Sequence, residues 1–131
     1  MVDPRELAPE QEPTAVLDPN ELARLIVQIA SDKKAEDIVM LDIHELSIIS
    51  DYFVICTGTS DRQVRAIAHG IDEQLKSSYG LNPLHLEGLQ EATWVLLDYG
   101  GVIVHIFDPA TRDYYRLEKL WAAAPRILVV Q

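Results

Sequence analysis

The chain has 131 residues and a mass of 14.7 kDa, with 48% hydrophobic and 24% charged residues, which fits one domain with a hydrophobic core and argues against two. Its 21 acidic and 11 basic residues give a net charge of −10, so a basic protein is a more suitable partner than nucleic acid. The single cysteine, Cys56, excludes an internal disulfide framework. With no apolar run near the roughly 20 residues of a membrane span, we expect a cytoplasmic protein that does not bind membranes.

The first 18 residues differ in composition from the rest of the chain. They contain five acidic residues and three prolines without a periodic apolar pattern, so we expect a disordered, acidic, proline-rich tail over residues 1–18. At the end of this segment, Asp18, Pro19 and Glu21 have the spacing of a capping box with proline at the first helical position. The apolar spacing behind them predicts a helix that runs to about Lys33 or Lys34.

Two short strands and a second helix are expected next. Residues 37–43 are apolar and partly β-branched, and residues 52–57 are apolar on both strand faces, as in the middle of an α/β sheet. Ser60 and Gln63 then have the spacing of another capping box, for a helix that ends at Gly80.

The second half of the chain is dominated by short strands. They are predicted at residues 84–87, 94–99 and 102–107, and the Gly-Gly pair between the last two predicts a tight hairpin. A final helix should begin near Thr111 with Tyr114, Leu117 and Trp121 as its apolar stripe, and residues 123–131 are expected to form a loosely ordered end. The predicted fold is therefore α/β, with one domain over residues 19–122 and a mixed five-stranded sheet with flanking helices.

The predicted hairpin sorts its side chains into two faces. With Gly100 and Gly101 as the turn, one face is apolar and typical of a core. The other face carries Trp94, Leu96, Asp98, Ile103, His105 and Phe107. A mixture of this kind is typical of the centre of a protein interface. The alternative is that the last helix covers this face as a second core, with His105 as a satisfied, half-buried histidine, and the sequence leaves both interpretations open.

Catalytic sites have weaker support. Cys56 lies in an apolar strand and is expected to be a core residue, and the four histidines lack the i, i+4 spacing of paired metal ligands. The turn from Gly58 to Ser60 is similar to the anion-binding turn of a nucleotidyltransferase, but no spaced carboxylate pair for Mg²⁺ follows it. We therefore expect a non-enzymatic protein without metal or cofactor, with a nucleotide-handling enzyme as the alternative.

Five blocks of sequence, in order over residues 20–122, resemble the ribosomal silencing factor family, also called RsfS or Iojap. The blocks are residues 51–64 (DYFVICTGTSDRQV), 87–88 (EG), 94–98 (WVLLD), 102–105 (VIVH) and 114–121 (YYRLEKLW). Gly101 departs from the acidic residue that family members often carry at the hairpin tip.

The resemblance implies a nucleotidyltransferase-like topology without catalytic carboxylates, in a binding module that has no known catalysis. It implies docking on large-subunit ribosomal protein fourteen, which blocks joining of the small subunit and lowers translation when nutrients are scarce. Organellar relatives are linked to large-subunit assembly, which makes an assembly adaptor a second alternative. Some members self-associate, so a homodimer off the ribosome is also implied.

The hairpin pattern and the resemblance together give a set of expected partner-binding residues. Trp94 is the expected apolar anchor with Leu96 beside it. The expected polar contacts are Glu87, Asp98 and His105, and the lesser candidates are Tyr99, Tyr115 and Glu118.

Overall fold

The computed structural model describes residues 17–131. Residues 1–16 of the expected tail lie outside the described residues. The elements are α2 (Pro19–Asp32), β1 (Glu36–Asp42), β2 (Tyr52–Thr57), α3 (Asp61–Tyr79), β3 (His85–Glu87), β4 (Trp94–Asp98), β5 (Val102–Phe107), α4 (Pro109–Tyr115), α5 (Leu117–Leu120) and β6 (Arg126–Val130). They form one mixed sheet in the order β3-β4-β5-β2-β1-β6, in which β2 and β5 pair in parallel and all other neighbours are antiparallel. The expected mixed α/β domain is confirmed, while a nucleotidyltransferase-like topology stays a prediction.

The two long helices begin where their capping residues predict. The Asp18 carboxylate accepts from the Glu21 N–H at 2.8 Å and the Glu21 carboxylate accepts from the Asp18 N–H at 3.2 Å, which completes the capping box of α2. In α3 the Ser60 hydroxyl accepts from the Gln63 N–H at 3.1 Å, but the Gln63 side chain accepts from Thr59 instead of Ser60. The predicted N-cap of α3 is therefore correct. The second hydrogen bond of the capping box, made by the Gln63 side chain, goes to Thr59, one residue before the N-cap.

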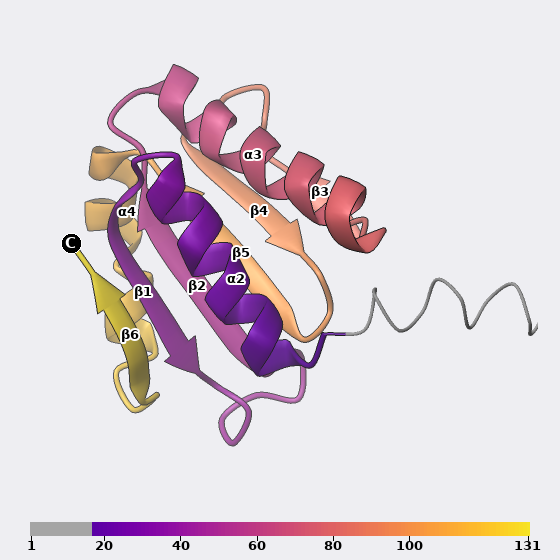
Figure 1. Cartoon of the computed structure of the whole chain (residues 1–131). Helices are drawn as coiled ribbons and strands as arrows, with labels where there is room; N and C mark the ends of the chain where they lie inside the picture. Colours follow the sequence, from indigo (N-terminus) through magenta and orange to yellow (C-terminus); the bar gives the residue numbers. More distant parts are fainter. Residues whose placement is uncertain (1–16) are drawn as a thin grey trace, which may run out of the picture.

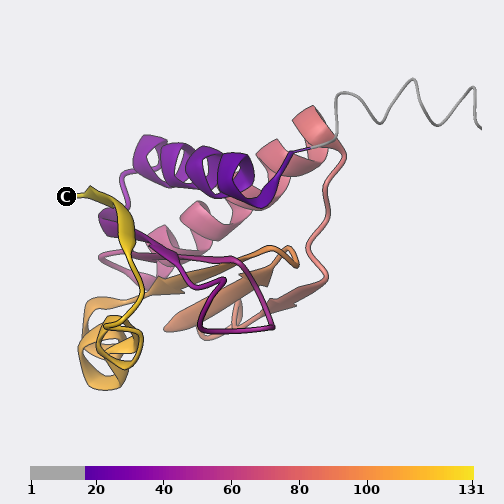
Figure 2. The same cartoon turned by 90° about the horizontal axis from the view of Figure 1, so that it is seen from below.

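Helices α2 and α3 cover one face of the sheet and enclose the main core (Figures 1 and 2). Strand β2 lies between β5 and β1 and is buried on both faces, as its apolar run predicts. Val54 and Cys56 face the helices, and Phe53 and Ile55 face a second, smaller core on the opposite side of the sheet.

The expected number of five strands is wrong, because residues 17–131 already form a sheet of six strands. The additional strand is β6, from the segment that we expected to be a loosely ordered end. It pairs antiparallel with β1, with Val129 opposite Val39. This pairing covers the backbone amides and carbonyls that β1 would otherwise expose as an edge strand, which gives an apolar, β-branched segment a physical reason to order.

The single C-terminal helix that we predicted is divided in two. Arg116 adopts a left-handed backbone with a φ of 47° between α4 and α5, so the expected stripe is not one continuous helical face. Helix α4 begins at Pro109, where the Asp108 carboxylate accepts from the Thr111 N–H at 2.8 Å. Figure 2 shows this segment beneath the sheet, on the side nearer the C-terminus, and none of the helices described lies below the β3–β4 side.

Candidate functional site

The register predicted for the hairpin is confirmed over β4 and β5. Trp94 lies opposite Phe107 and Leu96 lies opposite His105. Strand β3 adds Glu87 opposite Leu96 on the same face. We call the exposed part of this surface, formed by Glu87, Trp94, Leu96 and Asp98, the Trp94 face.

Exposure rises across this side of the sheet from β5 to β3. On β5, Ile103 is 8% exposed, His105 5% and Phe107 0%, and this half belongs to the second core with Leu117 and Trp121 packed against it. The outward residues of β4 are half-buried, and all of β3 is exposed. The two interpretations left open by the sequence therefore each describe part of the surface: β5 is core, and β4 remains accessible.

Trp94 is held by aromatic neighbours while part of its side chain stays accessible. Its ring centroid lies 4.8 Å from that of Phe107 and 4.9 Å from that of Tyr115. The indole N–H donates to His105 Nδ1 at 3.1 Å. These contacts fix the orientation of a large amphipathic side chain, as a pre-organised interface anchor requires.

A small hollow of about 280 Å³ lies beside the indole, lined by Glu87, Gly88, Trp94 and Leu96. Gly88 has a φ of 90°, and a Cβ at this position would lie 2.1 Å from the Trp94 carbonyl oxygen. Only glycine fits this close approach of β3 to β4. The Glu-Gly pair of the sequence thus places a carboxylate at the edge of an apolar hollow.

The structure separates two neighbouring candidates, Asp98 at the end of β4 and Tyr99 directly after it. Asp98 is half-buried on the Trp94 face, where one carboxylate oxygen accepts from the Gly100 N–H at 2.8 Å and supports the hairpin turn. Tyr99 packs against the main core on the opposite side of the sheet, as its hairpin position predicts. Burial raises the pKa of the Tyr99 hydroxyl, whose oxygen finds no partner among the described residues.

His105 is buried and uncharged at neutral pH. Burial lowers its pKa to about 4, and its Nδ1 accepts the indole hydrogen of Trp94, so the ring proton is on Nε2. Within residues 17–131, Nε2 has no hydrogen-bond partner. His105 therefore contacts Trp94 rather than solvent, and its ring is not accessible to a docking partner in this conformation.

Acidification should destabilise the protein through His105. The unfolded chain takes up a proton near the ordinary histidine pKa of about 6.5 while the folded ring does not, so lowering the pH from about 7 to 5 should remove about 2 kcal/mol of stability. His44, whose pKa is raised by its hydrogen bond to Asp42, acts in the opposite direction. Urea unfolding of the wild type and of His105→Phe at both pH values isolates the contribution. An equally steep pH dependence in the variant would contradict it.

The last two candidates, Tyr115 and Glu118, lie in different surroundings. Tyr115 is 49% exposed beside Trp94 and extends the Trp94 face onto α4. The Glu118 carboxylate is occupied by Arg112, which donates from Nε at 3.1 Å and from Nη2 at 2.9 Å. The structure brings Glu87, Leu96 and Tyr115 beside Trp94, with His105 behind the indole. It places Asp98 on the same face at the other end of β4, and it places Tyr99 and Glu118 elsewhere.

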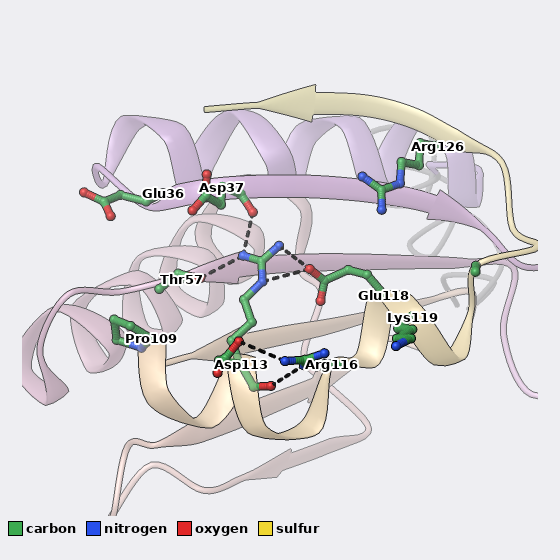
Figure 3. A pocket seen from close by; sticks show the side chains of 11 residues that line it. Glu36, Asp37, Thr57, Pro109, Asp113, Arg116, Glu118, Lys119 and Arg126 are labelled. Carbon is green, nitrogen blue, oxygen red and sulfur yellow. Dashed lines mark hydrogen bonds and ion pairs between the residues drawn. The ribbon is translucent and has the colours of Figure 1, made fainter.

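The Arg112 guanidinium also donates to the Asp37 carbonyl at 2.6 Å and to the Thr57 hydroxyl at 2.7 Å, so Asp37, Thr57 and Glu118 converge on it (Figure 3). The sequence pattern does not single out this residue. It lines a pocket of about 620 Å³ that holds basic and acidic side chains in equal number. A surface of balanced charge favours neither an anion nor a cation, and we assign this network to the stability of the fold.

The catalytic alternatives find little support in the geometry. Cys56 is fully buried, which raises the pKa of its thiol to about 12, so it is no nucleophile at neutral pH. In the turn before α3, the Thr59 N–H and the Ser60 hydroxyl are both engaged with Gln63. Within the described range, no three His, Cys, Asp or Glu side chains gather as a potential metal site. None of the helices described is both long and apolar enough to cross a membrane.

Comparison with known proteins identifies the family. A model described as "Ribosomal silencing factor during starvation" matches residues 16–131. The chain is 46% identical over 107 residues to ribosomal silencing factor RsfS of Halalkalibacterium halodurans, which covers 82% of this chain and 91% of that protein. A crystal structure of a Chromobacterium violaceum protein has a TM-score of 0.78 and 37% identity, covering 81% of this chain and 88% of that one. A mouse protein named mitochondrial assembly of ribosomal large subunit protein 1 is 32% identical over 99 residues, covering 74% of this chain and 43% of that protein. This chain belongs to the family of ribosomal silencing factors.

Proposed function

We propose that this protein docks through the Trp94 face on large-subunit ribosomal protein fourteen, where it blocks joining of the small subunit and represses translation under nutrient limitation. The observation that carries the proposal is a half-buried tryptophan, fixed by its neighbours, beside an apolar hollow on a side of the sheet that no described helix covers. The site of action would be the cytoplasm, and the mechanism is binding without catalysis.

The chemistry of the face suits a basic protein partner. Trp94 and Leu96 supply apolar area that loses water on docking, and tryptophan is among the residues that most often dominate binding energy. Glu87 and Asp98 place carboxylates beside this area, and the net charge of −10 adds long-range attraction to a basic surface. Tyr115 is the proposed contact from α4. His105 acts through the orientation of Trp94, since it is itself buried.

Steric exclusion requires only that the docked domain is rigid and occupies space needed by the small subunit. The six-stranded sheet with helices on it supplies a rigid body, and the Trp94 face lies on its surface. No conformational change, nucleotide or metal enters this mechanism.

A subunit-joining experiment tests the proposal. Purified large and small subunits are mixed with increasing amounts of the protein, and the joined ribosomes are separated by sedimentation. We expect joined ribosomes to decrease as the protein co-sediments with large subunits. Unchanged joining at saturating protein, together with nucleotide turnover in the presence of Mg²⁺, would instead favour the nucleotide-handling alternative.

An assembly adaptor is the second candidate function, and the name of the mouse relative favours it. The same face would then bind a precursor of the large subunit. Comparing affinities for mature large subunits and for precursors from growing cells separates the two roles, because an adaptor should prefer the precursor. Sedimentation velocity of the free protein tests the proposed homodimer off the ribosome.

A further inference from the structure

The loop between β1 and β2 carries an exposed aliphatic cluster that the Trp94 face does not include. Leu46 is 49% exposed, Ile49 76% and Ile48 104%. A single exposed aliphatic residue is ordinary on a protein surface, but three within four positions at one loop tip form a patch. We call residues 44–49 the isoleucine loop.

The isoleucine loop is ordered by its own hydrogen bonds. The N–H groups of Leu46 and Ser47 both donate to the Ile43 carbonyl at 2.9 Å, and the Ile49 N–H donates to the Ser47 hydroxyl at 3.0 Å. At the base of the loop, the Ile43 N–H donates to the Asp51 carbonyl at 2.8 Å. The backbone of the loop therefore forms a defined turn that presents the aliphatic side chains to solvent, which reduces the backbone entropy lost when a partner covers them.

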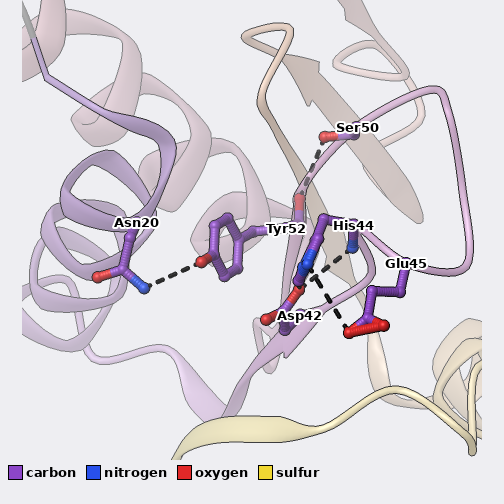
Figure 4. A network of polar contacts seen from close by, with 6 residues as sticks. All are labelled: Asn20, Asp42, His44, Glu45, Ser50 and Tyr52. Atoms are coloured by element: carbon purple, nitrogen blue, oxygen red, sulfur yellow. Dashed lines mark hydrogen bonds and ion pairs between the residues drawn. The ribbon is translucent and has the colours of Figure 1, made fainter.

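Acidic side chains lie beside this apolar tip. Two hollows of about 430 and 470 Å³ flank it, one lined by Glu45 and the other by Asp51, and among the described residues no lysine or arginine lines either hollow. At the end of β1, Asp42 holds His44 at a distance of 2.5 Å (Figure 4). The local charge is negative, so it repels the phosphates of RNA or of an anionic membrane and attracts a basic protein surface.

The loop lies at the opposite end of the hairpin from Trp94. Tyr52, which follows the loop, pairs with Val102, whereas Trp94 pairs with Phe107 at the other end of β5. One of the two hollows extends from the loop to the turn at Gly100 and Gly101. The isoleucine loop thus lies near the Asp98 end of the Trp94 face, whereas the Trp94 side chain is at the opposite end of the hairpin.

We infer that the isoleucine loop is a second docking point for the large subunit, and that it takes a basic protein surface with an apolar depression between lysine or arginine side chains. Ile48 and Ile49 would fill the depression, and Glu45 and Asp51 would meet the cations around it. This inference rests on the proposed function, because it assumes that the large subunit is the partner. Two separated contacts on a rigid body would also fix the orientation in which the domain docks.

The test replaces the apolar tip without touching the core. Affinity for purified large subunits is measured for the wild type, for Ile48→Ser/Ile49→Ser and for a control, Leu120→Ser, which removes a 76% exposed aliphatic residue on α5. We expect the loop variant to bind about ten-fold or more weakly with unchanged thermal unfolding, and the control to bind as the wild type does. Glu45→Gln should reduce the salt dependence of binding, because it removes one charge at the rim.

The outcomes separate the inference from the proposed function. If the wild type binds large subunits and the loop variant binds equally tightly, the second docking point is refuted while the function stands. If the wild type does not bind large subunits, the proposed function fails and the inference fails with it. If the loop variant binds normally but loses self-association in sedimentation velocity, the loop is a contact between copies of this chain, which also overturns the inference.

Discussion

Replacing Trp94 with alanine is expected to weaken binding to the large subunit by about 3 kcal/mol, a loss of affinity of about a hundred-fold. The indole is the largest apolar group on the Trp94 face, and its neighbours already hold it in one orientation. Docking would remove its accessible part from water at little cost in side-chain entropy. Affinity measured by co-sedimentation with large subunits over a range of protein concentrations checks the expectation.

Trp121 offers a matched control for this substitution. It is also a half-buried tryptophan, but its ring packs on Phe53 at a centroid distance of 5.2 Å, in the covered half of the same side of the sheet. Trp121→Ala should lower the thermal stability and leave the affinity of the folded fraction near that of the wild type. A folded Trp94→Ala variant with wild-type affinity would remove Trp94 from the docking contact.

The parts of the fold that were predictable depend on short-range signals. The hairpin register follows from a Gly-Gly turn between two apolar runs, because strand periodicity leaves few alternatives once the turn is placed. The caps of α2 and α3 follow from side chains that bond to backbone amides three residues away. Local chemistry of this kind is fully contained in a stretch of sequence.

The parts that were missed depend on contacts between distant segments. Strand β6 forms because β1 leaves an open edge for it, and the apolar residues 127–130 were the available signal. The burial of Ile103 and Phe107 on β5 depends on where Leu117 and Trp121 pack against the sheet, which neither segment determines alone. For the same reason, the open and covered halves of the hairpin face could not be distinguished before the break at Arg116 was known.

Arg112 is the clearest case of a distant contact, and Arg112→Met is expected to destabilise the fold by about 3 kcal/mol or more. Its side chain is 12% exposed and joins α4 to β1 through the Asp37 carbonyl, to β2 through the Thr57 hydroxyl and to α5 through Glu118. Methionine preserves much of the apolar stem but none of the hydrogen bonds. Urea unfolding at neutral pH measures the loss.

The cost should come largely from the charge left behind on Glu118. This carboxylate is 23% exposed, and its second oxygen already has no partner within the described range. Removing the guanidinium leaves a partly buried carboxylate without its counter-ion, which is more destabilising than removing both charges together. Arg112→Met/Glu118→Gln should therefore recover part of the lost stability, whereas equal losses in the single and double variants would show that the ion pair is not the source. Helix α4 also holds Tyr115 against Trp94. The Arg112→Met variant should therefore weaken docking only if the substitution displaces α4 from the sheet.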